Sequence, residues 1–297
     1  MKKKMRLSMR TRDSLIGLFY LTPFIIGLCA FFLYPIVSSL LLSFGDLDEE
    51  KIGFAIVLKG FDNFVKAFRT DTNFLPRLWR SLKSVIINTP LVVIFSLILA
   101  IMLSKVKYGK GFYRVVFLLP FVLGTGAVMT MLLKQGVDTQ IISISNSSII
   151  PRQWLLYLGA DIVEILDMFF SSIIRILWQS SVQLILFLSA ILGISPALYE
   201  SAKIDGANAY ETFWKITLPM VSPILLLNTV YTIITSFTDI NNEVLTYITD
   251  NTIRYAQHGY AAAMGWIYFI AILLIIGVVF LTIGSYARKN QGYGGKR

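Results

Sequence analysis

The chain has 297 residues, of which 56% are hydrophobic and only 15% are charged, and its formal net charge is +10. This composition suits a protein embedded in a lipid bilayer better than a soluble domain. The positive charge alone is compatible with nucleic-acid binding, but its distribution favours a membrane protein, so we expect no nucleic-acid partner. The single cysteine, Cys29, lies in an apolar stretch and excludes an intrachain disulfide framework.

Six apolar segments are each long enough to cross about 30 Å of hydrocarbon as an α-helix. Pro23 and Pro35 in the first segment predict a kink or an interfacial start. Because this segment is long and lacks a small-residue cleavage site, we do not expect a cleavable signal peptide. The predicted fold class is an all-α integral membrane protein with six transmembrane helices. The segments lie near residues 14–42, 84–104, 113–134, 173–194, 220–240 and 261–285.

Six spans place both termini on one side of the membrane. That side carries 16 Lys and Arg residues against four Asp and Glu residues, whereas the opposite side carries 11 basic and 13 acidic residues. The positive-inside rule therefore predicts a multi-pass protein of the cytoplasmic membrane, with both termini and residues 195–219 in the cytoplasm. The predicted parts are a basic N-terminus (1–13), the first transmembrane helix (14–42), an extracytoplasmic loop (43–83), a core with five further helices (84–287) and a basic tail (288–297).

A motif with fixed spacing lies between the fourth and fifth spans. Residues 200–219 read Glu-Ser-Ala, three residues, Gly, nine residues and Ile-Thr-Leu-Pro. A short helix can begin at Pro196, because proline is tolerated in a first turn. Gly206 lets the backbone turn or a partner approach closely, and Pro219 ends the segment before the fifth span. The alternative is an ordinary amphipathic helix at the membrane interface.

A polar stripe marks the fifth span and the residues after it. Its five members are spaced four, three, four and three residues apart, so one continuous helix would place them within a sector of about 80° over about 21 Å. Polar groups in hydrocarbon are costly unless they pair or face water. The stripe therefore predicts either a water-lined pathway for a hydroxyl-rich solute or a set of interhelical hydrogen bonds. The five residues are Asn228, Thr232, Thr235, Asp239 and Asn242.

The fourth span has a shorter stripe, formed by Ser172, Arg175, Gln179 and Gln183, and we take Gln179 and Gln183 as candidate pathway residues. Trp178 is adjacent, and it could stack on a solute ring, although tryptophan more commonly anchors a helix at the membrane interface.

The sixth span begins with two overlapping pairs of small residues, Gly259/Ala263 and Ala261/Gly265, which permit close helix packing. The chain has only one histidine and one cysteine, so we expect no metal site and no catalytic residue. It also lacks the Gly-x-x-x-x-Gly-Lys-Ser/Thr loop, so we expect no cofactor and no ATP bound by this chain.

The motif at 200–219 resembles the cytoplasmic coupling loop of ABC-importer membrane subunits, with Ser201 in place of the usual second alanine. Weaker likenesses at residues 21–40, 88–89, 111–120 and 259–265 extend this resemblance over residues 14–287. They are similar to the carbohydrate-uptake branch, and within it to the first membrane subunit of maltose or glycerol-phosphate systems. The resemblance assigns coupling to an ATPase to the loop 196–219, at Glu200, Ala202, Asp205, Gly206, Ile216, Leu218 and Pro219.

The resemblance implies the type I ABC importer permease fold and import of a sugar or oligosaccharide by alternating access. It also implies a homologous second permease subunit, two ATP-binding-cassette ATPases that bind the ATP, and an extracytoplasmic solute-binding protein. A charged solute, such as glycerol phosphate, an amino acid or a polyamine, would require a buried counter-charge, for which only Arg175 and Asp239 are candidates. A non-transport membrane scaffold is a further alternative, but the coupling loop would have no purpose in it. Two features depart from the pattern: the connection at 249–255 is short, and the large extracytoplasmic insertion of some maltose-type subunits is absent.

Overall fold

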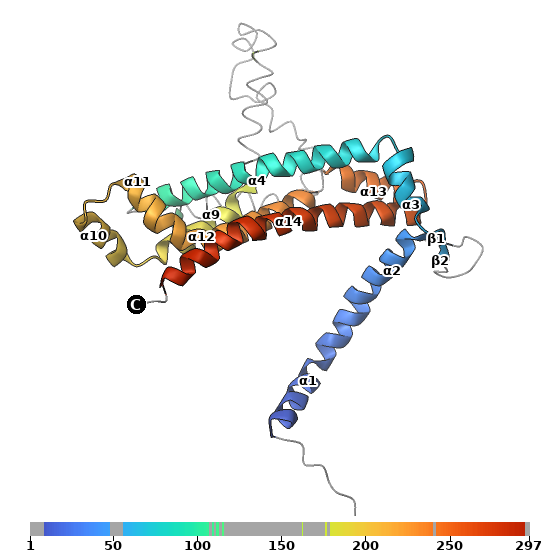
Figure 1. Cartoon of the computed structure of the whole chain (residues 1–297), viewed down its shortest axis with the longest axis horizontal. Coiled ribbons are helices and arrows are strands. Elements are labelled where there is room, and N and C mark those ends of the chain that lie inside the picture. The colour runs from blue at the N-terminus through green and yellow to red at the C-terminus, as the bar shows by residue number, and fades with distance from the viewer. Residues whose placement is uncertain are drawn as a thin grey trace, which may run out of the picture. The chain divides into compact units, whose positions relative to one another are not determined.

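The structure, a computed structural model, consists almost entirely of helices (Figure 1). The chain forms two compact units. The first contains Met1–Arg80 and Ile240–Ala271, and the second contains Ser81–Asp239 and Ile272–Arg297. The structure describes residues 9–47, 56–106, 109, 111–112, 115, 162, 176, 179–239 and 242–294.

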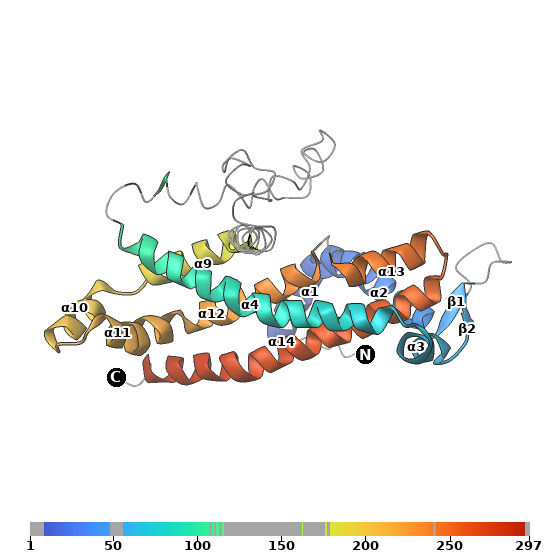
Figure 2. The ribbon, with the colours of Figure 1, turned by 90° about the horizontal axis from the view of Figure 1, so that it is seen from above.

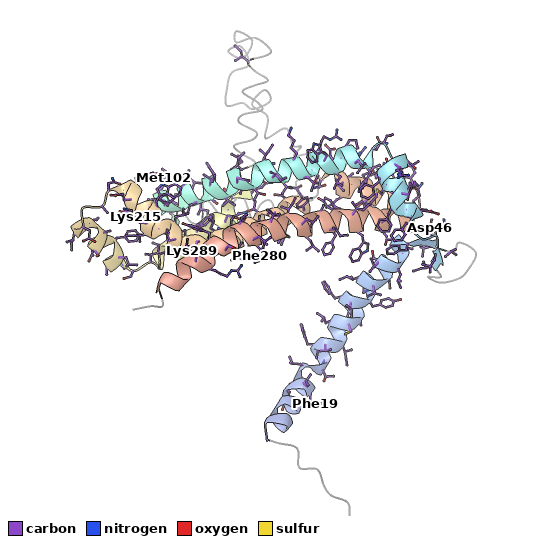
Figure 3. All side chains as sticks on the ribbon, in the orientation of Figure 1. Phe19, Asp46, Met102, Lys215, Phe280 and Lys289 are labelled. Atoms are coloured by element: carbon purple, nitrogen blue, oxygen red, sulfur yellow. The ribbon has the colours of Figure 1, made fainter. Side chains whose placement is uncertain are left out.

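In the first unit, the N-terminal apolar segment is helical but contains one widened turn. The ring of Pro35 would crowd the carbonyl of Phe31, and a π-helical turn relieves this by letting the Tyr34 N–H bond to the Cys29 carbonyl. Phe19 is 75% exposed and projects from the helix (Figure 3). The segment comprises α1 (Met9–Leu28), η1 (Cys29–Leu33) and α2 (Tyr34–Ser43).

The connection expected as a loop at 43–83 contains regular structure. It begins with an antiparallel strand pair in which Gly45 lies opposite Leu58. The following helix begins at Phe74, ten residues before the predicted start of the second span. This early start has a local cause, because the Asp71 carboxylate caps the helix by accepting the N–H groups of Asn73 at 2.7 Å and Phe74 at 3.2 Å. The elements are β1 (Gly45–Leu47), β2 (Ile56–Leu58), α3 (Asp62–Val65), η2 (Lys66–Thr70) and α4 (Phe74–Ser104).

The start of α14 (His258–Gly294) packs directly against β1. A Cβ atom on Gly259 would lie 1.9 Å from the Gly45 carbonyl oxygen, so only glycine fits at this contact. The Gly259 N–H donates to Asp46 Oδ1 at 3.2 Å, and Figure 3 shows Asp46 at this end of the unit. Gly265, the last member of the small-residue pairs, instead borders an apolar cavity of about 560 Å³ between α2, α13 and α14.

The helix α13 (Glu243–Ile253) lies between the predicted fifth and sixth spans, where sequence reasoning expected only a short loop. The preceding helix, α12 (Leu218–Phe237), ends at Phe237. Asp239 therefore follows α12, and Asn242 caps α13 by accepting the Val244 N–H at 3.0 Å. The expectation of one continuous helical face from Asn228 to Asn242 is thus wrong, because the chain leaves the helix between Thr235 and Asp239.

The second unit is built around an apolar core. Leu184 and Phe187 of α9 (Ser181–Leu192) and Val221 of α12 are completely buried there. Val93 and Leu97 of α4 complete the central contacts. Within this unit α4, α12 and α14 run in roughly the same direction in both views (Figures 1 and 2), as membrane-spanning helices do.

Four helical stretches among the described residues are long and apolar enough to cross a membrane, and a fifth is added if α9 and the bent helix after it count as one span. This confirms an all-helical membrane protein, while the count of six spans stays a prediction. The predicted third span (113–134) and the first part of the fourth (173–194) lie largely outside the described residues. The four stretches are Gly17–Ser43, Phe74–Ser104, Ala209–Phe237 and His258–Lys289.

Candidate coupling loop and solute pathway

The loop 196–219 begins with a sharp change of direction. Ser195 is extended (φ −57°, ψ 127°), and Pro196 occupies the first turn of α10 (Pro196–Ile204). The helices α9 and α10 meet at a bend of 65°. Proline fits here because the first N–H groups of a helix have no intrahelical partner. The loop therefore starts as the sequence predicts, with a short helix that leaves the direction of the preceding span.

Gly206 reverses the chain after α10. Its φ of +77° lies in the left-handed region, which strains residues with a side chain. The Gly206 N–H donates to the Lys203 carbonyl at 3.1 Å, and the Ala207 N–H donates to the Ala202 carbonyl at 2.9 Å, so the turn satisfies the last carbonyls of the helix. Backbone conformation, rather than close packing, is what requires glycine here.

The chain beyond the turn is fixed by a second capping arrangement. Asn208 and Glu211 cap α11 (Ala209–Thr212) reciprocally, with hydrogen bonds of 2.9 and 3.1 Å. The π-helical turn η5 (Phe213–Thr217) then leads into α12. The hydroxyls of Tyr199 and Thr217 lie 3.2 Å apart and join α10 to η5. Tyr199 and Leu218 also pack against the core of α4, α9 and α12, so the loop is attached to the span helices.

The face of α10 that points away from this core is exposed and carries both apolar and charged side chains. Ile204, at the end of the helix, is 86% exposed between Lys203 and Asp205. Sequence reasoning missed Ile204, because an apolar residue in an amphipathic helix is normally assigned to the buried face. The position of Ile204, two residues before the turn at Gly206, was the signal from which its exposure could have been predicted. Of the seven predicted coupling residues, Glu200, Asp205 and Gly206 are exposed, Ile216, Leu218 and Pro219 are half-buried, and Ala202 is buried.

Three of the predicted pathway residues meet between α9 and α12. Gln183 Nε2 donates to Thr232 Oγ1 at 2.9 Å, and Asn228 Nδ2 donates to the Gln183 carbonyl at 3.1 Å. All three side chains are at most 1% exposed. This arrangement is the interhelical contact that was one of the two interpretations of the stripe.

The same cluster has unused hydrogen-bonding capacity. Gln183 Oε1 and Asn228 Oδ1 are buried and accept no hydrogen bond from the described residues. A buried acceptor without a donor is costly, by about 1–3 kcal/mol. Both oxygens can therefore be stabilised by a water molecule or a hydroxyl group that reaches them.

The remaining pathway residues are less buried than this cluster. Thr235 is exposed, and its hydroxyl donates to the carbonyls of Tyr231 at 3.0 Å and Thr232 at 3.1 Å. Gln179 and Asp239 are half-buried. The predicted neighbours Ser172, Arg175 and Trp178 lie outside the described residues. In the part of the chain that the structure describes, no group of His, Cys, Asp and Glu side chains is placed to hold a metal ion.

No protein-family model matches the chain. It is 29% identical over 306 residues to the probable ABC transporter permease protein YesP of Bacillus subtilis, with 91% of each chain covered. It is 24% identical over 296 residues to the arabinooligosaccharides transport system permease protein AraP of the same organism, covering 92% of this chain and 89% of AraP.

A solved structure has the same fold. It is a bacterial alginate ABC transporter in complex with an alginate pentasaccharide-bound periplasmic protein, and the matching chain is 22% identical with a TM-score of 0.59. The match covers 93% of this chain and 96% of that one. Similarity along nearly the whole length, together with the shared fold, identifies the chain as a homologue of sugar ABC transporter permeases: a membrane transport subunit with the ABC importer permease fold, and not an enzyme.

Proposed function

We propose that the chain forms half of the translocation pathway of an ATP-driven, binding-protein-dependent importer for a sugar or oligosaccharide. The observation that carries this proposal is the loop 196–219, which is attached to the span helices on one side and exposes Glu200, Ile204 and Asp205 on the other. A homologous second permease subunit completes the pore. Two ATP-binding-cassette ATPases bind the ATP, and an extracytoplasmic solute-binding protein delivers the sugar.

The loop transmits the closure of the ATPases to the pore. An ATPase contacts Glu200 and Asp205 at the exposed face, with Ile204 as an apolar contact between them. The buried Ala202 and the half-buried Ile216, Leu218 and Pro219 carry the displacement into α9 and α12. Gly206 supplies the turn that keeps α10 in place. The transport cycle is then a two-state equilibrium that ligands bias from both sides of the membrane.

The proposed orientation has both termini and the loop in the cytoplasm, at the cytoplasmic membrane. The supporting observation is the excess of Lys and Arg on that side. The same orientation places the first unit's strand pair and α13 outside, where a binding protein docks.

The groups that bind the solute are the side-chain amides and hydroxyls of the candidate pathway residues. Neutral solutes are favoured, because Asp239 is the only charged residue among the candidates. The buried cluster of Gln183, Asn228 and Thr232 offers two acceptors that sugar hydroxyls can satisfy once α9 and α12 separate. The candidate residues are Gln179, Gln183, Asn228, Thr232, Thr235, Asp239 and Asn242.

The test is the solute-stimulated ATPase activity of the reconstituted complex. Glu200→Ala and Gly206→Asp should abolish the stimulation, whereas Ser201→Ala, which restores the alanine usual in coupling loops, serves as a matched exposed control. Wild-type stimulation in both Glu200→Ala and Gly206→Asp would refute the coupling assignment.

A further inference from the structure

Asp71 joins three helices in the first unit. Its Oδ1 atom caps α4 through the N–H groups of Asn73 and Phe74, at 2.7 and 3.2 Å. Its Oδ2 atom accepts the Tyr247 hydroxyl of α13 at 2.7 Å and also the Tyr260 hydroxyl of α14. One carboxylate therefore binds the first turns of two span helices and the middle of α13.

Asp71 is charged at neutral pH. Partial burial acts to raise its pKa, but the hydrogen bonds from Tyr260, Tyr247 and the two backbone N–H groups outweigh burial and hold the pKa below its usual value. The four hydrogen bonds are therefore charge-assisted, which makes them stronger than bonds between neutral groups.

Two cations hold the tyrosine rings in place. Lys66 Nζ lies 4.2 Å from the centre of the Tyr260 ring and donates to Gln257 Oε1 at 2.8 Å. The Arg77 guanidinium lies 4.6 Å from the centre of the Tyr247 ring. Both distances are in the range of cation–π attraction. Each hydroxyl is thus directed at Asp71 by a ring whose own position is fixed.

The position of α13 depends strongly on this network. The helix has only 11 residues, and Val244 and Asn251 are its only buried residues. A helix this short is marginal by itself in water. Arg80 also bonds Glu243 at 2.8 Å, but both side chains are more than half exposed, so this pair contributes little.

We propose that Asp71 is a positioning residue that fixes α13 to the first turns of α4 and α14, so that the three move as one body. Because Asn242 caps α13, the same contact also positions this candidate pathway residue. The part of the inference that concerns the transport cycle rests on the proposed function, whereas the fixation of α13 does not.

A distance measurement between η2 and α13 tests the proposal. Spin labels are placed at Phe68→Cys and Ile253→Cys, which are 53% and 75% exposed in the native chain, on a Cys29→Ala background. The assembled complex in lipid nanodiscs is measured by pulsed dipolar spectroscopy, first without nucleotide and then trapped with ATP and vanadate. We expect one narrow distance distribution that is the same in both states.

Tyr247→Phe removes the bond between α13 and Asp71 while keeping the ring. It should broaden the distribution and reduce the protection of the α13 amides against hydrogen exchange. Tyr255→Phe is the matched control, because Tyr255 is 64% exposed and has no interaction with Asp71. Tyr260→Phe gives an independent variant on the α14 side, and we expect it to broaden the distribution as well.

The outcomes distinguish the positioning role of Asp71 from the movement of the three helices as one body. A narrow distribution in Tyr247→Phe and Tyr260→Phe without nucleotide would overturn the positioning role, whatever the chain transports. A wild-type distance that changes on trapping would overturn the movement as one body. Broadening in Tyr255→Phe equal to that in Tyr247→Phe would also count against Asp71, because the effect would not be specific to its contacts.

Discussion

Different kinds of contact stabilise the interior of each of the two units. In the second unit, apolar side chains of α4, α9 and α12 form the core, and the contact between Gln183 and Thr232 is deeply buried within it. In the first unit, the carboxylates of Asp46 and Asp71 bind backbone N–H groups and tyrosine hydroxyls. A chain in hydrocarbon must satisfy its polar groups internally, whereas a segment in water can use charged groups as connectors.

This difference predicts where a small change is most damaging. In the first unit we expect Gly259→Ala to have the largest effect, because its new methyl group would overlap the Gly45 backbone. Overpacking of this kind costs about 1–3 kcal/mol, and the value should be near the upper end because backbone atoms must move. Thermal unfolding of the purified complex measures the loss. Gly265→Ala is the control, because a Cβ there has nothing within 4 Å and alanine favours a helix, so this variant should not lose stability.

Asp71→Asn should be the next largest effect. The amide is neutral and can accept hydrogen bonds through one oxygen only, so both tyrosine hydroxyls lose their charged acceptor. Hydrogen bonds to charged groups contribute about 1.5–3 kcal/mol each, and partial exposure of Asp71 reduces this, so we expect a loss of about 2 kcal/mol. Equal stability of Asp71→Asn and wild type in thermal unfolding would show that polar connectors do not hold the first unit.

The sequence predicts contacts between neighbouring residues better than contacts between residues that are far apart in the chain. The backbone of the loop 196–219 was predicted at two of its residues, because the Pro196 start and the Gly206 turn are local features, while the coupling role of the loop stays a prediction. The Asp71 contacts were missed, since Tyr247 and Tyr260 are 176 and 189 positions away. The capping role of Asp71 could have been predicted, because Asp before a helix start is a known signal.

The polar stripe shows a different reason for failure. Helical periodicity placed Asn228, Thr232 and Thr235 on one helix, as the structure has them. It could not place the end of α12 at Phe237, because the apolar pattern gives no stop signal there. The pairing of Gln183 with Thr232 was likewise beyond periodicity, since it depends on how two spans pack.

Substitutions in the polar stripe of the second unit should have a smaller effect on stability. Asn228→Ala removes one buried interhelical hydrogen bond and should lower stability by about 0.5–1.5 kcal/mol. Thr235→Val leaves the buried cluster intact, because its hydroxyl bonds only its own helix, so stability should be unchanged while solute uptake falls. Uptake normalised to assembled complex separates the two roles. Normal uptake in Thr235→Val would remove this residue from the proposed pathway.

The smallest expected effect is that of pH on the first unit. A carboxyl whose pKa is lowered by folding stabilises the fold above its unfolded pKa of about 4, and this contribution is lost as pH falls through the folded value. Tyr247, which faces Asp71, does not titrate in this range, because burial followed by the hydrogen bond and the charge of the Asp71 carboxylate raises the pKa of Tyr247 above its usual value. The difference in unfolding temperature between wild type and Asp71→Asn should therefore stay constant from about pH 8 to pH 5 and shrink below about pH 4. A difference that already shrinks between about pH 7 and pH 5 would mean that the carboxylate is not stabilised by its four hydrogen bonds, and the contrast between a polar first unit and an apolar second unit would lose its main support.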